Sequence, residues 1–288
     1  MKWQEGHRSD DVEDRRGQGI GPGGGGFGGA RLGVGGMILV GVLSLVFKRN
    51  LFVYFQGGGA PSSQTSSAGP RAGSPEEERL MSFVSFVFDD VQNVWAEWLP
   101  RSGQNYARAR MVVFTDRVRS GCGVAESAMG PFYCPADRKV YVDLGFYGEL
   151  QRRFGAPGDF AQAYVIAHEV GHHLQNLLGT ERRVRAAQRR DPSQENALSV
   201  RMELQADCYA GVWAHSTQQR NLLERGDVDE GLAAASAVGD DRIQRQAGRA
   251  VNPESWTHGS ARQRAAWFRK GFTTGDVNQC DTFSLPDP

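Results

Sequence analysis

The five residues His168-Glu169-Val170-Gly171-His172 constrain this chain more than any other stretch. Residues four apart on an α-helix lie on one face, so both imidazoles can point at a single cation with Glu169 close by. Imidazole is a common zinc ligand, and a carboxylate beside such a site can accept a proton from water. On a helix, the pattern therefore indicates metal-dependent hydrolysis. The alternative is that both histidines are ordinary polar residues of a helix.

The flanking residues predict that this segment is helical. Asp159, followed three residues later by Gln162, is a capping-box signature that starts a helix at Phe160, and Gly179 is a typical glycine stop. Between them, apolar residues recur at spacings of three and four, which is typical of an amphipathic helix. These are Phe160, Tyr164, Ala167, Val170, Leu174 and Leu177.

A catalytic zinc site needs a third protein ligand and leaves the fourth position to water. Downstream, Asp191 as N-cap and Pro192 at the first helical position predict a second helix, which carries Glu203 and Asp207 one turn apart. We predict that Glu203 is the third zinc ligand. We predict that Asp207 accepts a hydrogen bond from the outer nitrogen of a ligand histidine. The alternative is a solvated acidic helix face.

These two motifs resemble those of gluzincins, in which HExxH on one helix is completed by the glutamate of ExxAD on a later helix. More narrowly, the chain resembles the putative neutral zinc metallopeptidase family of bacterial single-span membrane proteins along nearly its whole length. The resemblance is carried by MKWQEGHRSDDVEDRRG, GPFYCPADRKVYVDLGFY, RFGAPGDFAQAYVIAHEVGHHLQ, RMELQADCYAGVW and THGSARQRAAWFRKGF.

This resemblance implies a zinc-dependent peptidase that acts on a protein or peptide substrate. It implies that His168, His172 and Glu203 bind Zn²⁺ and that Glu169 is the catalytic carboxylate. The gluzincin pattern also expects a side-chain donor for the oxyanion, for which we take His258 as the candidate. Its alternative roles are to cap the following helix or to bond a neighbouring carbonyl.

His173 lies about 100° round the helix from His172, so we assign it a structural role. In the expected mechanism, zinc lowers the pKa of a bound water and Glu169 accepts its proton. A rival interpretation is a membrane-tethered binding or scaffold protein, whose metal stabilises the helix pair and whose groove holds peptides without cleaving them. Glu169 argues mildly against the rival, because a structural metal site needs no base.

The charge balance argues against nucleic acid as a partner. Lysine and arginine total 33, as do aspartate and glutamate, so no net field attracts a polyanion. No glycine-rich phosphate loop joins a strand to a helix. The sequence does not indicate an oligomeric state.

The four cysteines are Cys122, Cys134, Cys208 and Cys280, and none belongs to a C-x-x-C pair. Three pairings are possible. Cys122 and Cys134 flank a short glycine-rich turn, whereas Cys208 lies on the Glu203 helix and Cys280 near the C-terminus, so local pairing favours Cys122 with Cys134 and Cys208 with Cys280. The alternative is four buried thiols.

The N-terminal part differs in composition from the rest of the chain. Residues 1–31 are charged and then glycine-rich, which predicts a disordered cytoplasmic tail. Residues 32–47 are all apolar, Gly or Ser and would rise about 24 Å as a helix, so we expect a single-pass transmembrane anchor. Residues 48–75 are expected to form a flexible linker to a zinc metallopeptidase domain over residues 76–288.

Basic residues flank both ends of the apolar run, so charge does not determine its orientation. Paired cysteines favour an oxidising compartment for the catalytic domain, and the resemblance implies the same. We therefore expect a protein of the bacterial inner membrane, with a periplasmic or other extracytoplasmic catalytic domain.

The fold class that we predict is α+β and mainly helical, namely a zincin-like domain with a small sheet. Residues 111–114 are expected to form a strand, and residues 139–144 an edge strand that holds an extended substrate. Apolar residues between positions 83 and 98 predict a buried helix, and residues 227–248 and 261–272 predict two packing helices.

Overall fold

The computed structural model describes residues 1–18, 73–127, 130–154, 158–286 and 288. The expected membrane anchor at 32–47 lies outside these residues, as do residues 19–31 and 48–72. None of the helices that the structure describes has both the length and the apolar character needed to cross a bilayer.

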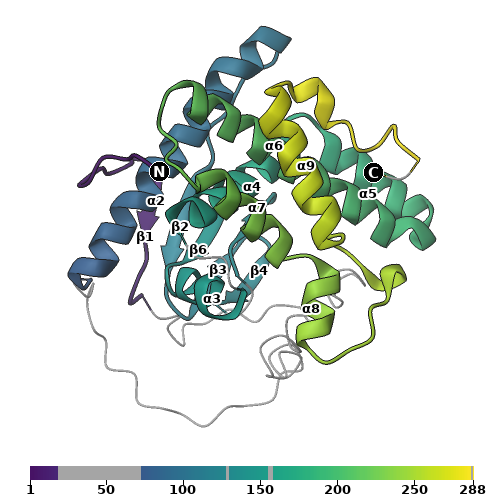
Figure 1. Ribbon diagram of the computed structural model, residues 1–288, viewed down its shortest axis with the longest axis horizontal. Helices are drawn as coiled ribbons and strands as arrows, with labels where there is room; N and C mark the ends of the chain where they lie inside the picture. Colours follow the sequence, from purple (N-terminus) through teal and green to yellow (C-terminus); the bar gives the residue numbers. More distant parts are fainter. Residues whose placement is uncertain (19–72, 128–129, 155–157, 287) are drawn as a thin grey trace.

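A four-stranded sheet with the order β1-β2-β6-β5 lies beside the helices that carry the motifs (Figure 1). β1, β2 and β6 run parallel, whereas β5 is antiparallel to β6. The strands span Val12–Asp14 (β1), Arg110–Phe114 (β2), Phe132–Cys134 (β5) and Lys139–Asp143 (β6), and a separate antiparallel hairpin contains Arg117–Ser120 (β3) and Gly123–Glu126 (β4). The prediction that residues 139–144 form an edge strand is wrong, because β6 pairs on both sides and β5 lies at the edge.

Alternating residues of β2 explain the two faces of the sheet. Met111 and Val113 belong to the large apolar core shared with the helices, whereas Val112 and Phe114 belong to a smaller cluster with the β3–β4 hairpin. Both faces of this strand are therefore buried, which accounts for its continuous run of apolar residues.

The predicted α+β, mainly helical organisation is confirmed. The α-helices are α2 (Pro75–Trp98), α3 (Gly145–Phe154), α4 (Asp159–Leu177), α5 (Thr180–Arg190), α6 (Glu195–Gln219), α7 (Asp227–Ala237), α8 (Asp240–Gln246) and α9 (Ala261–Thr274). Short 3₁₀ turns occur at Leu99–Ser102 (η2), Pro192–Gln194 (η4), Pro253–Ser255 (η5) and Val277–Cys280 (η6). The helix predicted over residues 227–248 is two helices, which are separated at Val238 and Gly239. There the Asp240 carboxylate accepts bonds from the backbone N–H groups of Thr257 and His258 at 2.8 and 2.7 Å.

Residues 1–18 are part of this fold, so the predicted disorder over residues 1–31 is wrong for them. Backbone hydrogen bonds join Met111 N–H to Asp11 and Arg15 N–H to Val113, each at 2.8 Å. The Trp3 ring packs edge-on against Phe83 of α2, with centroids 5.3 Å apart. Figure 1 shows the segment running beside α2 and the sheet. The sequence did not predict this strand, because β1 is short and charged and its pairing partner lies far along the chain.

Both favoured cysteine pairings are confirmed. Cys122–Cys134 joins the turn between β3 and β4 to β5, with 5.8 Å between the Cα atoms. Cys208–Cys280 joins α6 to η6, with 5.5 Å between the Cα atoms. The second pair ties the C-terminal turn to the helix that carries Glu203.

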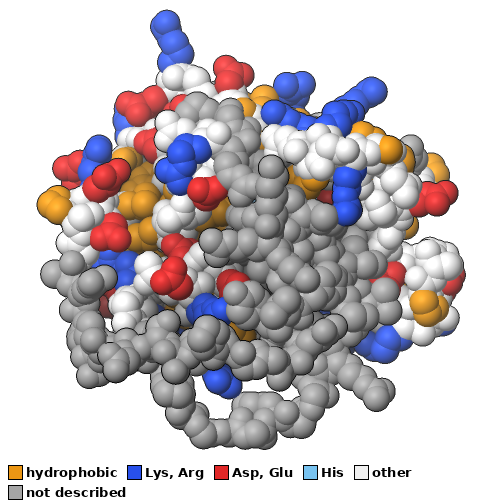
Figure 2. Space-filling model, turned by 90° about the horizontal axis from the view of Figure 1, so that it is seen from below, with side chains coloured by type: hydrophobic (Ala, Val, Ile, Leu, Met, Phe, Trp, Pro, Cys, Tyr) orange, Lys and Arg blue, Asp and Glu red, His pale blue; other side chains and the backbone are white. Residues whose placement is uncertain are grey.

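Charges of both signs occur together on the face that Figure 2 shows. In Figure 2, acidic and basic side chains are interspersed on the described part of the face seen from below. This arrangement agrees with the equal totals of acidic and basic residues.

Candidate metal centre

The HExxH segment lies on α4, but its helix starts differently from the prediction. The N-cap is Gly158, and no side chain caps the helix. The Asp159 carboxylate instead pairs with the Met1 ammonium at 2.6 Å, so the predicted capping box is wrong. The Glu230 side chain of α7 instead accepts a hydrogen bond from the free Phe160 N–H in the first turn, at 3.1 Å. The predicted glycine stop is confirmed, because Gly179 follows the helix with a φ of 70°.

The second helix begins nearly as predicted. The Asp191 side chain accepts a bond from Ser193 N–H at 3.1 Å, starting a 3₁₀ turn that leads into α6. α4 and α6 pack closely at the two motifs, because a Cβ on Gly171 would lie only 3.1 Å from the Ala206 backbone. This close approach brings Glu203 opposite the two histidines.

His168, His172 and Glu203 converge on one point. A ligand atom from each lies within 4.8 Å of the others. His168 Nε2 is 3.3 Å from Glu203 Oε2, and His172 Nε2 is 3.4 Å from Glu203 Oε1. Donors about 2.0–2.1 Å from a tetrahedral zinc ion lie about 3.4 Å apart. The two observed N–O spacings are close to that value.

Hydrogen bonds on the outer nitrogens direct both Nε2 atoms toward Glu203, although Arg264 Nη2 also lies 3.4 Å from His168 Nε2. His168 Nδ1 bonds Asp207 Oδ1 at 2.9 Å, and His172 Nδ1 bonds Gln175 Oε1 at 2.8 Å. A carboxylate or carbonyl partner on one ring nitrogen fixes the tautomer that presents the other to a metal. Asp207 thus lies where the sequence places it. Gln175 was missed, although its position three residues after His172 on one helix was a usable signal.

The electrostatics of the cluster suit a cation. His168 is 6% exposed and Asp207 is fully buried. Burial by itself lowers the pKa of His168, but Asp207 and Glu203 outweigh it and raise that pKa to about 9. Burial would raise the pKa of Glu203, but the neighbouring histidines hold it well below its usual range. The carboxylates of Glu203 and Asp207 therefore stabilise positive charge at this point, whether a proton or a metal ion supplies it.

Glu169 lies beside the ligands and is nearly enclosed, with 8% of its surface exposed. Burial raises its pKa, which the nearby histidines and the backbone N–H of Tyr133 partly counteract. A buried carboxylate with a raised pKa is suited to accept and return a proton near neutral pH. Tyr133 belongs to β5, so the edge strand lies next to this carboxylate.

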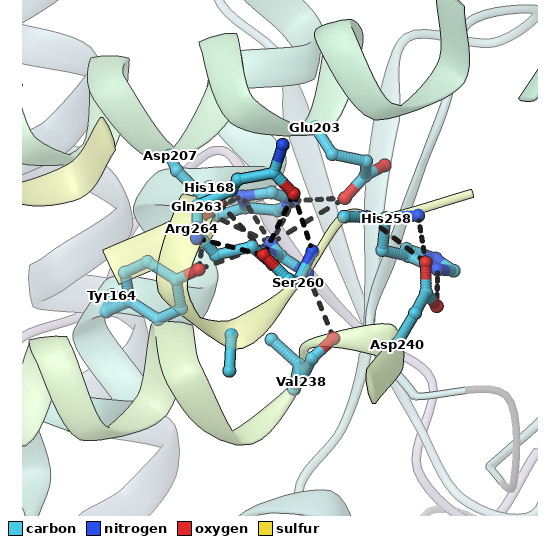
Figure 3. Close-up of polar contacts among 12 residues, drawn as sticks. Tyr164, His168, Glu203, Asp207, Val238, Asp240, His258, Ser260, Gln263 and Arg264 are labelled. Atoms are coloured by element: carbon cyan, nitrogen blue, oxygen red, sulfur yellow. Dashed lines mark hydrogen bonds and ion pairs between the residues drawn. The ribbon is translucent and has the colours of Figure 1, made fainter. Parts of the chain in front are cut away.

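His258 is held near the cluster by Asp240 (Figure 3). Its Nδ1 lies 3.1 Å from Asp240 Oδ1, and its own backbone N–H donates to Asp240 Oδ2 at 2.7 Å. Burial lowers the pKa of His258, but Glu203 and Asp240 together raise it. The sequence did not reveal Asp240, because its contacts depend on how the loop before α9 folds back onto α8.

Arg264 of α9 is the largest omission from the sequence interpretation. Its guanidinium is buried, with 3% of the residue exposed. Nε donates to Asp207 Oδ2 at 2.8 Å and Nη2 donates to Asp207 Oδ1 at 3.0 Å. Figure 3 shows it among Asp207, His168 and Tyr164. No local pattern indicated this role, because Arg264 reaches the site only through the packing of α9 on α6.

His173 lies away from the ligand cluster, on the sheet side of α4. Its Nδ1 lies 3.0 Å from the Tyr133 hydroxyl, and its Nε2 donates to the Ala107 carbonyl at 2.6 Å. Burial lowers its pKa to about 4, so the ring is neutral at physiological pH. These contacts link α4 to β5 and to the chain before β2.

His168, His172 and Glu203 form a candidate metal centre where α4 meets α6, and the family comparison is consistent with such a site. The family model described as "Putative neutral zinc metallopeptidase" matches residues 1–283, and the chain belongs to this family. "Uncharacterized protein YpfJ" of Escherichia coli strain K12 is 48% identical over 98% of this chain and 99% of its own length. "Uncharacterized protein Rv2575" of Mycobacterium tuberculosis H37Rv is 46% identical over 75% of each chain. No solved structure matches this chain significantly.

Proposed function

We propose that this protein is a membrane-associated, zinc-dependent metalloendopeptidase. The observation that carries the proposal is the convergence of His168 Nε2, His172 Nε2 and the Glu203 carboxylate at tetrahedral spacing. Both outer ring nitrogens are occupied by acceptors, as expected for metal-binding histidines. Two imidazoles, which become neutral when they bind the metal, and one carboxylate match the protein ligands of catalytic zinc peptidase sites.

When bound at this site, Zn²⁺ would supply Lewis acidity and lower the pKa of water. Glu169 would accept the proton of the attacking water and return it to the nitrogen of the leaving amine. Its burial supports both transfers, because the raised pKa reduces the free-energy difference between its two protonation states near neutrality. His258 would donate a hydrogen bond to the developing oxyanion, and Asp240 would keep its ring oriented.

We propose that an extended peptide binds beside β5 rather than β6. β5 lies at the edge of the sheet, and the backbone of its central residue, Tyr133, faces Glu169. An edge strand can bind a peptide through backbone hydrogen bonds, which are largely independent of the peptide's sequence. This substrate class is a protein or peptide in extended conformation.

Membrane attachment through residues 32–47 remains part of the proposal, and it rests on their apolar composition. The packing of β1 changes the topology that this attachment would have. Within residues 1–18, β1 pairs with β2 of the catalytic domain, so the two parts belong on the same side of any bilayer. The two disulfides favour an oxidising compartment for both.

The competing interpretation is a peptide-binding or scaffold protein in which the metal only stabilises the pair of helices. Glu169 and the pair His258–Asp240 favour the enzyme, because a purely structural site needs neither a base nor an oxyanion donor. Zinc binding without cleavage of any member of a broad peptide library would support the scaffold.

Glu169→Gln tests the proposal most simply, because it removes the base and keeps the shape of the side chain. We expect the zinc-loaded variant to keep its metal and to lose library cleavage by at least about a thousandfold. His258→Gln should keep the metal and lower kcat by roughly 10²–10³ with little change in KM. Retained cleavage by Glu169→Gln would reject Glu169 as the base.

A further inference from the structure

Arg264 is buried against the site, and nothing in the expected mechanism uses it. Its two bonds to Asp207 form a fork that fixes both carboxylate oxygens. Nη2 also lies 3.2 Å from the Tyr164 hydroxyl and 3.6 Å from Glu203 Oε2. Its distances to His168 Nδ1 and Nε2 are 3.3 and 3.4 Å. A planar guanidinium bound in this way restricts the rotation of a carboxylate more strongly than a single donor can.

The packing of α9 holds the backbone of Arg264 in place. The helix begins with a capping box, in which the Ser260 side chain and Gln263 exchange bonds with each other's backbone. Further along, a Cβ on Gly271 would lie 2.0 Å from the Cys208 carbonyl oxygen, so only glycine permits this approach of α9 to α6. The close packing of α9 on α6 therefore fixes the position of Arg264 beside the site.

Asp207 makes the shortest contacts that connect Arg264 with the ligand set. Its Oδ1 accepts bonds from Arg264, from the Tyr164 hydroxyl at 2.5 Å and from His168 Nδ1 at 2.9 Å. If the carboxylate rotated, it would release the outer nitrogen of His168 and with it the ring orientation that aims Nε2 at Glu203. Partners of this kind, one step behind a ligand, typically change metal affinity 10- to 100-fold when removed.

We propose that Arg264 is a positioning residue of the metal centre: it clamps Asp207 so that His168 presents Nε2 to the metal. This inference rests on the proposed zinc site. It makes a prediction whose sign is informative, because the charge of Arg264 by itself repels a divalent cation. If charge were its main effect, removing Arg264 would tighten zinc binding. If positioning is its main effect, removal weakens binding.

The test is the zinc dissociation constant of the full chain, measured by competition with a chelator. We expect Arg264→Gln to weaken binding 10- to 100-fold, and Arg264→Lys, which keeps the charge but not the fork, to weaken it about threefold to tenfold. Asp207→Asn should weaken binding as strongly as Arg264→Gln. The double variant should be little worse than either single variant, because both act through one carboxylate.

Several outcomes would overturn the inference. Tighter or unchanged binding in folded Arg264→Gln would do so, as would additive losses in the double variant. If Arg264→Gln does not fold, Arg264→Lys decides, and wild-type affinity in that variant would exclude a role for the fork. Failure of the wild-type chain to bind zinc would instead reject the proposed function, so the two failures can be distinguished.

Discussion

The metal centre and the N-terminal segment differ in how their residues reach one another. The ligands lie on two helices, and within each helix the relevant residues are one turn apart, as in His168 with His172 and Glu203 with Asp207. β1 reaches its place by pairing with β2, far along the chain. A helical motif is legible in sequence because its geometry is local, whereas the pairing of a three-residue strand is not.

This comparison also has a topological consequence. A single crossing at residues 32–47 would put residues 1–18 and the metal centre on opposite sides of a membrane. Their pairing requires that they share one compartment. The N-terminal strand thereby limits the cellular arrangement of the site, although it contributes no ligand.

The largest expected effect is in cysteine labelling, which distinguishes a shared compartment for residues 1–18 and the metal centre from opposite sides of a membrane. All four cysteines are paired, so a cysteine introduced at an exposed position would be the only free thiol. We expect Glu5→Cys and Arg152→Cys, whose native side chains are 71% and 68% exposed, to react equally with a membrane-impermeant maleimide on intact cells or spheroplasts. Reaction of one and protection of the other until lysis would contradict the shared compartment.

A smaller effect is expected from His173, on the sheet side of the metal helix. Its folded-state pKa is about 4, so below its ordinary value near 6.5 the unfolded chain takes up a proton first. Its contribution to stability is therefore present above pH 6.5 and is lost as the pH falls toward 4, by up to about 3 kcal/mol.

The check is urea unfolding of the zinc-free protein at several pH values, for wild type and His173→Gln. Because His168 and His172 titrate in both proteins, the difference between the two isolates His173. We expect the stability advantage of wild type over the variant to shrink between pH 6.5 and 4. An advantage that does not change with pH would show that His173 is not buried as a neutral ring.

The smallest expected effect concerns Trp3, in the segment that the sequence suggested was disordered. Because its ring packs on Phe83, Trp3→Ala should lower the free energy of unfolding by about 2 kcal/mol. The matched control is Glu5→Ala at an exposed position, which should change stability by no more than about 0.5 kcal/mol. Equal stabilities for the two variants would mean that the segment does not pack on α2.

Features that depend on local helix geometry were predicted from the sequence, whereas most features that depend on contacts between distant segments were not. Sequence spacing predicted the helix of the HExxH segment and the positions of Glu203 and Asp207. Local pairing predicted both disulfides. Asp240 and Arg264 were not, because each meets its partner only after α8 and α9 have packed. The capping box at Asp159 failed because a distant amine competes for that carboxylate. The choice of edge strand failed because β5, with only three residues, gave no alternation to recognise.

Zinc content of the purified full chain tests the central claim most directly. Glu203→Ala removes the third ligand, and Glu195→Ala, in the first turn of the same helix, is a matched control outside the site. We expect one zinc per chain in wild type and in Glu195→Ala, and a large loss of zinc in Glu203→Ala. A full complement of zinc in Glu203→Ala would contradict the ligand set on which the account depends.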